Sequence, residues 1–225
     1  MFSFDAFVKL NLFLRGAYKL AYLNLLWIAA TLAGLVLFGI GPASFAVAAY
    51  VDRWFRFGET PPVTRAFLGH FREQYWRAAA MGWILTAATL IVSTNILGAG
   101  TWMLRFANIV ALVVIAIIAA YVFPVMAATD IRGPHQQIAA ALMLGIGSLQ
   151  WTIVAGAAVT GAVWLLATFA LPALLLFGIG IPAAAIGFVT RVVFGSLTAD
   201  DPQTSPPRAR ESAHARVHLA RGTSE

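Results

Sequence analysis

Two stretches of the chain decide its fold: WIAATLAGLVLFGIGPA at residues 27–43 and WLLATFALPALLLFGIGIPA at residues 164–183. With one two-residue gap and one one-residue gap, Trp27 aligns with Trp164, and Phe38-Gly39-Ile40-Gly41 aligns with the same four letters at 177–180. Pro42-Ala43 then aligns with residues 182–183. An ordered run of this length seldom arises by chance in an apolar chain. The repeat therefore predicts a helix break at two corresponding places.

The composition indicates an integral membrane protein. Hydrophobic residues make up 60% of the 225 residues and charged residues 11%, which leaves too little polar surface for a soluble fold of this length. Apolar runs at 78–104, 106–129 and 138–190 each exceed the roughly 20 residues that cross a hydrocarbon core. Cysteine is absent, which excludes disulfides and thiol ligands.

The formal net charge of +6 does not predict nucleic-acid binding. The basic residues flank apolar segments, and no folded basic module accompanies them. Lysines and arginines at such positions orient a membrane protein and contact anionic lipid headgroups at the cytoplasmic face. We therefore expect the bilayer as a partner, and no nucleic acid.

Residues 20–50 carry no charge and could be taken for one very long helix. The second copy of the repeat argues against this, because it contains Leu171-Pro172, and proline tends to end a helix at the preceding residue. By analogy the first copy breaks near Ala33-Gly34. This predicts spans at 13–33 and 35–54, with the FGIGP letters inside the returning helix as a kink or close-packing patch.

The distribution of arginine supports this hairpin. Further spans near 77–98, 105–127, 138–169 and 173–195 leave only Arg105 at the outer face, as the positive-inside rule expects. The predicted fold is all-α: a polytopic transmembrane helical bundle of about six spans within residues 1–197, with both termini cytoplasmic. Residues 198–225 are polar, with Asp200-Asp201-Pro202 and Pro206-Pro207 and no apolar period, and predict a disordered cytoplasmic tail.

The segment 52–77 combines arginines with many aromatic residues, and Pro61-Pro62 marks a turn in it. One interpretation is a short amphipathic helix at the membrane interface. The other is a pair of cytoplasmic extensions of the flanking helices. The aromatic residues are Trp54, Phe55, Phe57, Phe67, Phe71, Tyr75 and Trp76.

Ionisable residues within spans are the usual sign of a proton or ion pathway. None occurs at 20–50, 78–104, 106–129 or 138–190, which disfavours a proton-coupled transporter. We expect the polar residues in these stretches to form hydrogen bonds between helices more than to line a solute path. They are Asn24, Thr31, Thr86, Thr89, Asn108, Gln150, Thr152, Thr160 and Thr168. Glycines favour close helix packing over a substrate site; they are Gly34, Gly39, Gly41, Gly145, Gly147, Gly156, Gly161, Gly178, Gly180 and Gly187.

The sequence predicts no catalytic, cofactor or metal site. His214 and His218 have an i,i+4 spacing but fall in the expected tail, and His70 and His135 are isolated. No nucleophile elbow, metalloprotease, P-loop or dinucleotide motif is present. We therefore expect a protein that is not an enzyme and has no cofactor.

Several short words resemble the YesL family, also known as domain of unknown function 624. They are LNLLW at residues 23–27, Gly41-Pro42-Ala43, RWFR at residues 53–56, and Ala66-Phe67 followed by Phe71. The resemblance covers about residues 10–98, although the family usually has a proline at the end of the first span where this chain has Ala33-Gly34. It implies a small bacterial integral membrane protein without an assigned activity, in a family often encoded beside carbohydrate uptake systems.

These observations lead to two hypotheses for function. The first is a non-enzymatic accessory component of a carbohydrate ABC importer in the cell membrane, which rests on the resemblance, on the absence of charge within the spans and on the basic, aromatic segment 52–77. The alternative is a small solute permease or channel, which the paired Gly-Pro breaks support.

Overall fold

The computed structural model describes residues 4–59, 61–131 and 133–199, and every regular element within them is a helix. Three helices, α4, α5 and α7, are long and apolar enough to cross a membrane by length and composition. The helices are α1 (Phe4–Ala33), α2 (Ile40–Phe57), α3 (Val63–Glu73), α4 (Tyr75–Gly98), α5 (Trp102–Ala128), α6 (Pro134–Gly147), α7 (Leu149–Phe169), α8 (Leu171–Phe177) and α9 (Gly180–Ala199).

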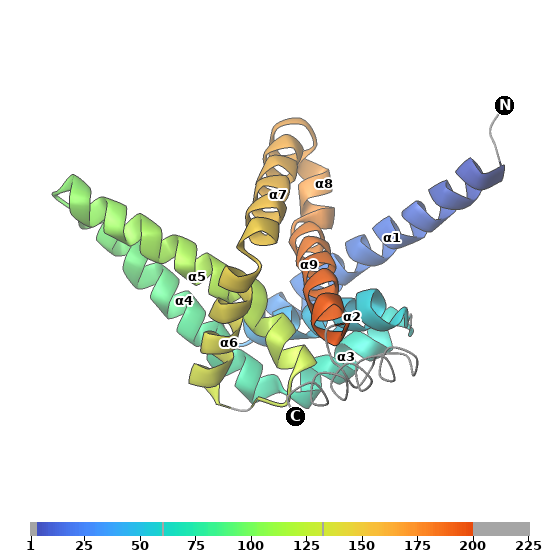
Figure 1. Cartoon of the computed structure of the whole chain (residues 1–225), viewed down its shortest axis with the longest axis horizontal. Helices are drawn as coiled ribbons and strands as arrows, with labels where there is room; N and C mark the ends of the chain where they lie inside the picture. Colours follow the sequence, from blue (N-terminus) through green and yellow to red (C-terminus); the bar gives the residue numbers. More distant parts are fainter. Residues whose placement is uncertain (1–3, 60, 132, 200–225) are drawn as a thin grey trace, which may run out of the picture.

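The long helices spread like the ribs of a fan from a common base (Figure 1). The hairpin of α4 and α5 points to one side and α1 to the other, while α7 and α8 rise between them. Helices α2 and α3 lie at the base of the fan. Among the described residues, the outer parts of α1, of the α4–α5 hairpin and of α7 and α8 therefore lack helical neighbours on one or both sides.

Helix α2 is the centre of the packing, because it contacts α1, α3, α4, α5 and α9. It contributes Phe45 and Ala49 to one buried apolar cluster and Val47 and Tyr50 to another. Its first turn tolerates Pro42, whose missing N–H is not needed there. Its last turn ends at Gly58, which adopts a left-handed φ of 67° and donates its N–H to the Trp54 carbonyl.

The predicted break near Ala33-Gly34 is confirmed, since α1 ends at Ala33. Residues 34–39 form a turn in which Leu35 and Val36 adopt positive φ angles of 51° and 65°, an unfavourable region for both. Contacts with α4 hold this turn: the Trp83 Nε1 atom donates to the Leu37 carbonyl at 2.7 Å, and the Trp83 ring packs edge-on against the Phe38 ring.

The expected placement of the FGIGP letters inside the returning helix is wrong for the first two. Phe38 and Gly39 belong to the turn, and α2 begins at Ile40. The reason is a close approach to α1, because a Cβ atom on Gly39 would lie 2.6 Å from the Ala30 carbonyl oxygen. The turn therefore needs glycine at this position.

The second copy also breaks where the proline predicts. Helix α7 ends at Phe169, and Pro172 lies in the first turn of α8. The expected ranges 138–169 and 173–195 nevertheless contain further interruptions, at Ser148 and at 178–179. At the first of these, the Ser148 hydroxyl donates a hydrogen bond to the Leu144 carbonyl, one of the last carbonyls of α6.

The two copies of the repeat correspond in the structure and contact each other. Helices α2 and α9 begin at Ile40 and Gly180, within one residue of alignment. The copies differ in that the second inserts the short helix α8 where the first has only a turn. The backbone N–H of Ile179 donates to Oδ1 of the buried Asn24 at 2.9 Å, so α1 compensates the break before α9.

The segment 52–77 contains a separate short helix, as the first interpretation expected. Helix α3 starts directly after Pro62, and buries Phe67 against the core. Its Thr64 hydroxyl is 2.8 Å from the Tyr22 hydroxyl of α1, and the Lys19 ammonium lies 5.1 Å from the Trp54 ring centre. The first contact joins α3 to α1, and the second joins α1 to the end of α2.

Basic segments far apart in the sequence meet at the base of the fan. Arg77 at the start of α4 donates to the Ile131 carbonyl at 3.0 Å, and the side chain of Gln137 in α6 donates to the same oxygen at 2.7 Å. Arg105 lies instead near the turn that joins α4 to α5, where it donates to the Ala99 carbonyl. The expected tail lies outside the described residues from position 200 onward.

We predict that Gly41→Ala destabilises the protein by about 1–3 kcal/mol, the usual cost of overpacking a tight contact. Gly41 lies directly against the backbone of α4, so a Cβ atom would overlap the Ala78 carbonyl. Unfolding of the purified protein in mixed micelles, followed by circular dichroism, measures the change. Gly156→Ala in α7 is the matched control, because the space around Gly156 is open; an equal loss in both variants would contradict the proposed packing.

We also predict that Asn24→Ala destabilises the protein by about 1–2 kcal/mol, since it leaves the partly buried N–H of Ile179 without this acceptor. Asn108→Ala is the control, because Asn108 is half-buried and, among the contacts described, bonds only to the Leu104 carbonyl of its own helix. The same unfolding measurement applies. Equal stability of the Asn24 variant and the wild type would show that the bond between the copies contributes nothing.

Candidate functional site

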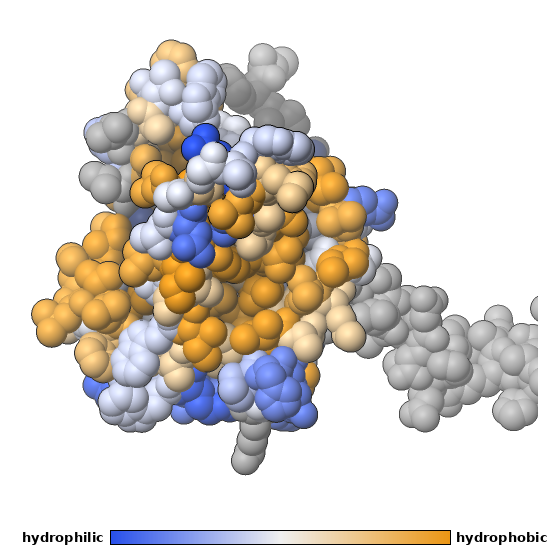
Figure 2. Space-filling view, turned by 90° about the vertical axis from the view of Figure 1, so that its left-hand side faces the viewer, coloured by the Kyte–Doolittle hydropathy of each residue, from blue (hydrophilic) through white to orange (hydrophobic). Residues whose placement is uncertain are grey.

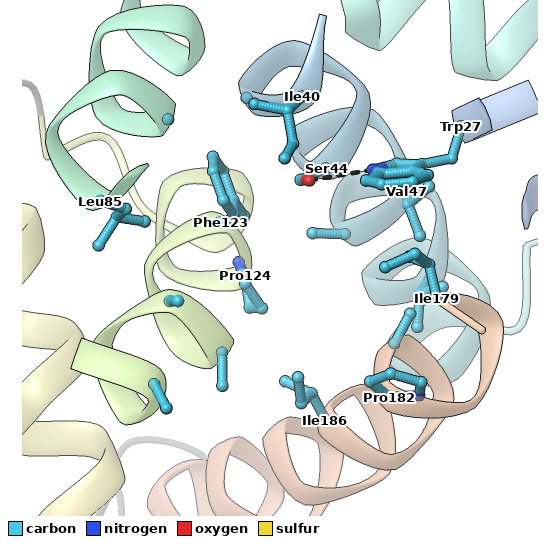
Figure 3. A pocket seen from close by; sticks show the side chains of 18 of the residues that line it. Trp27, Ile40, Ser44, Val47, Leu85, Phe123, Pro124, Ile179, Pro182 and Ile186 are labelled. Atoms are coloured by element: carbon cyan, nitrogen blue, oxygen red, sulfur yellow. Dashed lines mark hydrogen bonds between the residues drawn. The ribbon is translucent and has the colours of Figure 1, made fainter. Parts of the chain in front are cut away.

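A cavity of about 720 Å³ lies between α2, α4, α5 and α9. In Figure 3, Leu85, Phe123 and Pro124 face Val47 and Ile186 across the open space. Each helix contributes one face, because its lining residues recur every three or four positions. The lining positions are 40, 41, 44, 47, 48, 51 and 52 in α2, 82, 85, 86, 89, 90 and 93 in α4, 116, 119, 120, 123 and 124 in α5, and 182, 183, 186, 187 and 190 in α9.

Both copies of the repeat close one end of the cavity. Trp27 and Ile179, one from each copy, both line this side of the cavity (Figure 3). The Trp27 indole N–H donates to the Ser44 hydroxyl at 3.0 Å, and Ile179 is held by its bond to Asn24. Residues of both repeat copies thus line one side of the cavity.

The surface of the cavity is almost entirely hydrocarbon. Its hydroxyl-bearing lining residues are Ser44, Thr86, Thr89, Ser93 and Thr190. Two of these hydroxyls already have partners, since that of Ser44 accepts from the Trp27 indole and that of Thr190 donates to the Gly187 carbonyl. Few polar groups therefore remain to recognise a hydrated ligand.

Asp52 is the only charged residue among the described lining residues. Its side chain is 9% exposed, and the Arg56 Nη1 atom lies 3.2 Å and 3.4 Å from its two carboxylate oxygens. The Arg56 guanidinium is the ion-pair partner of this carboxylate, and the two opposite charges offset each other. Asp52 therefore presents little uncompensated charge to the cavity.

The sequence analysis did not identify Asp52 as a cavity residue, because it counted only the uncharged stretch ending at Tyr50. A signal was present: Ser44, Ala48 and Asp52 follow at intervals of four and share one face of α2.

A proline inside α5 adds a backbone acceptor that the sequence analysis also missed. Pro124 has no N–H, so the carbonyl of Ala120, four residues earlier, loses its usual helical donor. Both residues line the cavity.

Polar residues predicted to join helices do so in two cases. Asn24 bonds to Ile179, and the Thr152 hydroxyl of α7 lies 2.7 Å from the Tyr121 hydroxyl of α5. Thr86 and Thr89 instead line the cavity, which was the less favoured expectation.

The remaining polar residues serve local roles or face outward. Asn108 and Thr168 bond to carbonyls of their own helices, Gln150 and Thr160 are exposed, and Thr31 is buried without a hydrogen-bond partner for its hydroxyl among the described residues.

Close packing is borne out for some of the predicted glycines. Gly41 contacts α4, Gly145 contacts Ile117 of α5, and Gly187 contacts Val51 of α2. Gly156 and Gly161 of α7 face open space and pack against nothing.

A second cavity of about 520 Å³ lies at the basic end, between the end of α2 and α3. His70 belongs to it, and its Nδ1 atom is 3.3 Å from a Glu73 oxygen. Across residues 4–59, 61–131 and 133–199, no group of three His, Cys, Asp or Glu side chains could hold a metal ion; His214 and His218 lie outside these ranges. The residues around the cavity are Arg53, Pro61, Pro62, Arg65, Ala66, Gly69, His70 and Glu73.

Comparison with known proteins identifies relatives of this architecture. The chain is 31% identical over 126 residues to the uncharacterized protein YesL of Bacillus subtilis (strain 168), a match that covers 55% of this chain and 60% of the relative. It is 28% identical over 140 residues to YteU, covering 60% and 63%, and 34% identical over 112 residues to YesV, covering 47% and 54%; both are uncharacterized proteins of the same organism.

The chain thus spans a little over half of the length of these curated relatives. No solved structure matches it significantly. Residues 20–96, which run from α1 to near the end of α4, match the family described as protein of unknown function, DUF624. Together with the three relatives, this match supports a YesL-like DUF624 assignment and shows that this part of the chain is similar to that family.

Proposed function

We propose that the protein is a non-enzymatic accessory component of a carbohydrate ABC importer in the cell membrane. The observation that carries this proposal is α7, a helix of 21 residues of which none is buried. A helix so poorly covered by its own chain offers a long apolar surface for the transmembrane helices of a partner. The choice of an importer as the partner rests on the family resemblance.

The exposed surface of α7 has the residue types found where transmembrane helices pack against each other. Exposed aromatic side chains mark both of its ends, Trp151 at one and Trp164 and Phe169 at the other. Between them, Gly156 and Gly161 leave open space that would let another helix approach closely. Contact with a partner helix would therefore gain dispersion contacts and lose no hydrogen bond.

The main cavity gives less support to the alternative of a solute permease. A sugar or an ion that crosses the membrane must exchange its hydration for polar groups of the protein. The lining residues supply few such groups, and Asp52 is already paired with Arg56. The alternative of a small solute permease or channel is therefore the weaker proposal.

The anionic lipid headgroups of the cytoplasmic face form a second proposed partner. Arg53 and Arg65 flank the polar cavity at the end of α2, and Arg72 lies in the last turn of α3. Figure 2 shows a broad hydrophobic area on one face of the molecule, with hydrophilic residues along its lower edge and others above it. Each basic side chain near an anionic surface contributes about 1 kcal/mol.

The proposed topology has both termini in the cytoplasm and six crossings. The proposal counts three hairpins, α1 with α2, α4 with α5, and α7 with α8 and α9; in Figure 1 the second and third return toward the base, whereas α1 runs from its outer end to the base, where α2 lies. Three hairpins return the chain to the side on which it starts. The basic segments that meet at Arg77 and Ile131 then share the cytoplasmic side.

The topology can be tested with single cysteines, because the natural chain contains none. Six crossings predict that Val36→Cys and Gly100→Cys both react in intact cells with a membrane-impermeant maleimide, and that Gly58→Cys reacts only after lysis. Reaction of the Gly100 variant alone would contradict six crossings and leave the first hairpin re-entrant. Reaction of the Gly58 variant in intact cells would overturn the proposed orientation.

The accessory role predicts that importer subunits co-purify with the tagged protein from native membranes in mild detergent. Gly156→Trp should reduce their recovery, since it adds bulk to the open surface of α7 without contacting its own core. Gly147→Trp is the matched control, because the space around Gly147 at the end of α6 is also open. Recovery of no transporter subunit in several detergents would contradict the proposal.

A further inference from the structure

We propose that the cavity between α2, α4, α5 and α9 is a binding site for the hydrocarbon chain of a membrane lipid. This site is independent of the partner proposed for α7, because α7 contributes no residue to the lining. The volume of about 720 Å³ and the apolar lining fall within the range of pockets that hold small ligands, roughly 300–1,000 Å³.

The mouth of the cavity lies along two of the candidate membrane spans. Among the lining residues, Thr86 and Leu90 of α4 and Ala116 of α5 are exposed, and Leu90 is 64% exposed. Both helices are long and apolar enough to cross a membrane. A ligand that enters between them comes from the hydrocarbon layer and not from water.

The depth of the cavity favours a chain over a helix of a partner protein. Val47 and Phe123 belong to the lining but are only 3% and 9% exposed, so the space narrows toward them. An α-helix with its side chains is about 10 Å wide. A hydrocarbon chain is far thinner and can reach these residues, whereas a helix would stop at the mouth.

The energetics of the cavity also favour hydrocarbon. Water inside would meet few free polar groups, and an empty space would leave the lining atoms without dispersion partners. A hydrocarbon chain restores those contacts without breaking a hydrogen bond. Because Arg56 compensates Asp52, the site does not require a cationic group, and the polar head of the lipid stays outside the cavity.

Photo-crosslinking tests this site directly. The purified full-length protein is reconstituted into phosphatidylcholine vesicles that contain a trace of a phosphatidylcholine with a diazirine in its acyl chain, irradiated, and mapped by peptide mass spectrometry. We expect adducts at Val47 and Phe123 in addition to adducts on the exposed surface of α7. Bulk lipid can label α7, but it reaches Val47 and Phe123 only by entering the cavity.

Two variants fill the cavity from its exposed mouth, Ala116→Phe on α5 and Thr86→Phe on α4. Each should abolish the adducts at Val47 and Phe123 while the labelling of α7, which reports intact folding, stays at the wild-type level. Ala107→Phe is the matched control, because Ala107 is exposed on α5 but does not line the cavity; it should leave all adducts unchanged.

The proposal is overturned if the wild-type protein carries adducts on α7 but none at the buried lining residues. That result would exclude a lipid chain and leave a partner's helix at the mouth as the remaining occupant. The proposal is equally overturned if adducts at Val47 and Phe123 persist in both filled variants with α7 labelling unchanged.

Discussion

The contact between α2 and α4 at Gly41 is the constraint on which the rest of the structure depends. Gly41 lies directly against the backbone of Ala78, and a Cβ atom on Gly82 would be 2.8 Å from the Gly41 Cα atom. Two helices that meet so closely at one point must diverge on either side of it, since neither can bend around the other. The cavity fills the space between the diverging walls, and both glycines belong to its lining.

The same region of close packing contains the short sequences that carry the family resemblance, which lie in the first part of the chain. Within the matched residues 20–96, Asn24 bonds to Ile179, Trp27 bonds to Ser44, and Gly41 meets α4. Phe67 is buried where α3 joins this core. The words that carry the resemblance are therefore the side chains that hold α1, α2, α3 and α4 together, and they extend this hold to the second copy through Asn24.

Features set by local chemistry were predictable from the sequence. The break at Ala33 followed from the repeat and from the proline in its second copy, and the short helix after Pro62 was one of the two interpretations that the sequence left open. The break at Ser148 was not predictable, because α6 and α7 form one continuous apolar run and only the packing of α6 against α5 separates them. The cavity and the burial of Asp52 depend in the same way on four helices distant in sequence.

The depth of the first hairpin follows from its anchor and from the chemistry of its turn. In the proposed six-crossing topology, Lys19, whose ammonium lies over Trp54, marks the side of the base, and the 14 residues to Ala33, about 21 Å of helix, carry the turn to the opposite boundary of the hydrocarbon core. The turn that follows is suited to this depth. Its backbone bonds are made within the protein, from Val36 N to the Thr31 carbonyl and from Phe38 N to the Gly34 carbonyl.

Leu35, exposed at 80%, presents hydrocarbon and not a charge at the tip of the turn. A turn with satisfied backbone groups and apolar side chains can lie at the boundary of the hydrocarbon layer, where an ordinary polar loop would extend into water. The polar recognition groups of the described chain then concentrate at the base, among the arginines of α2 and α3. In the proposed topology, a partner would therefore approach this protein either from the side of its base or through the plane of the membrane.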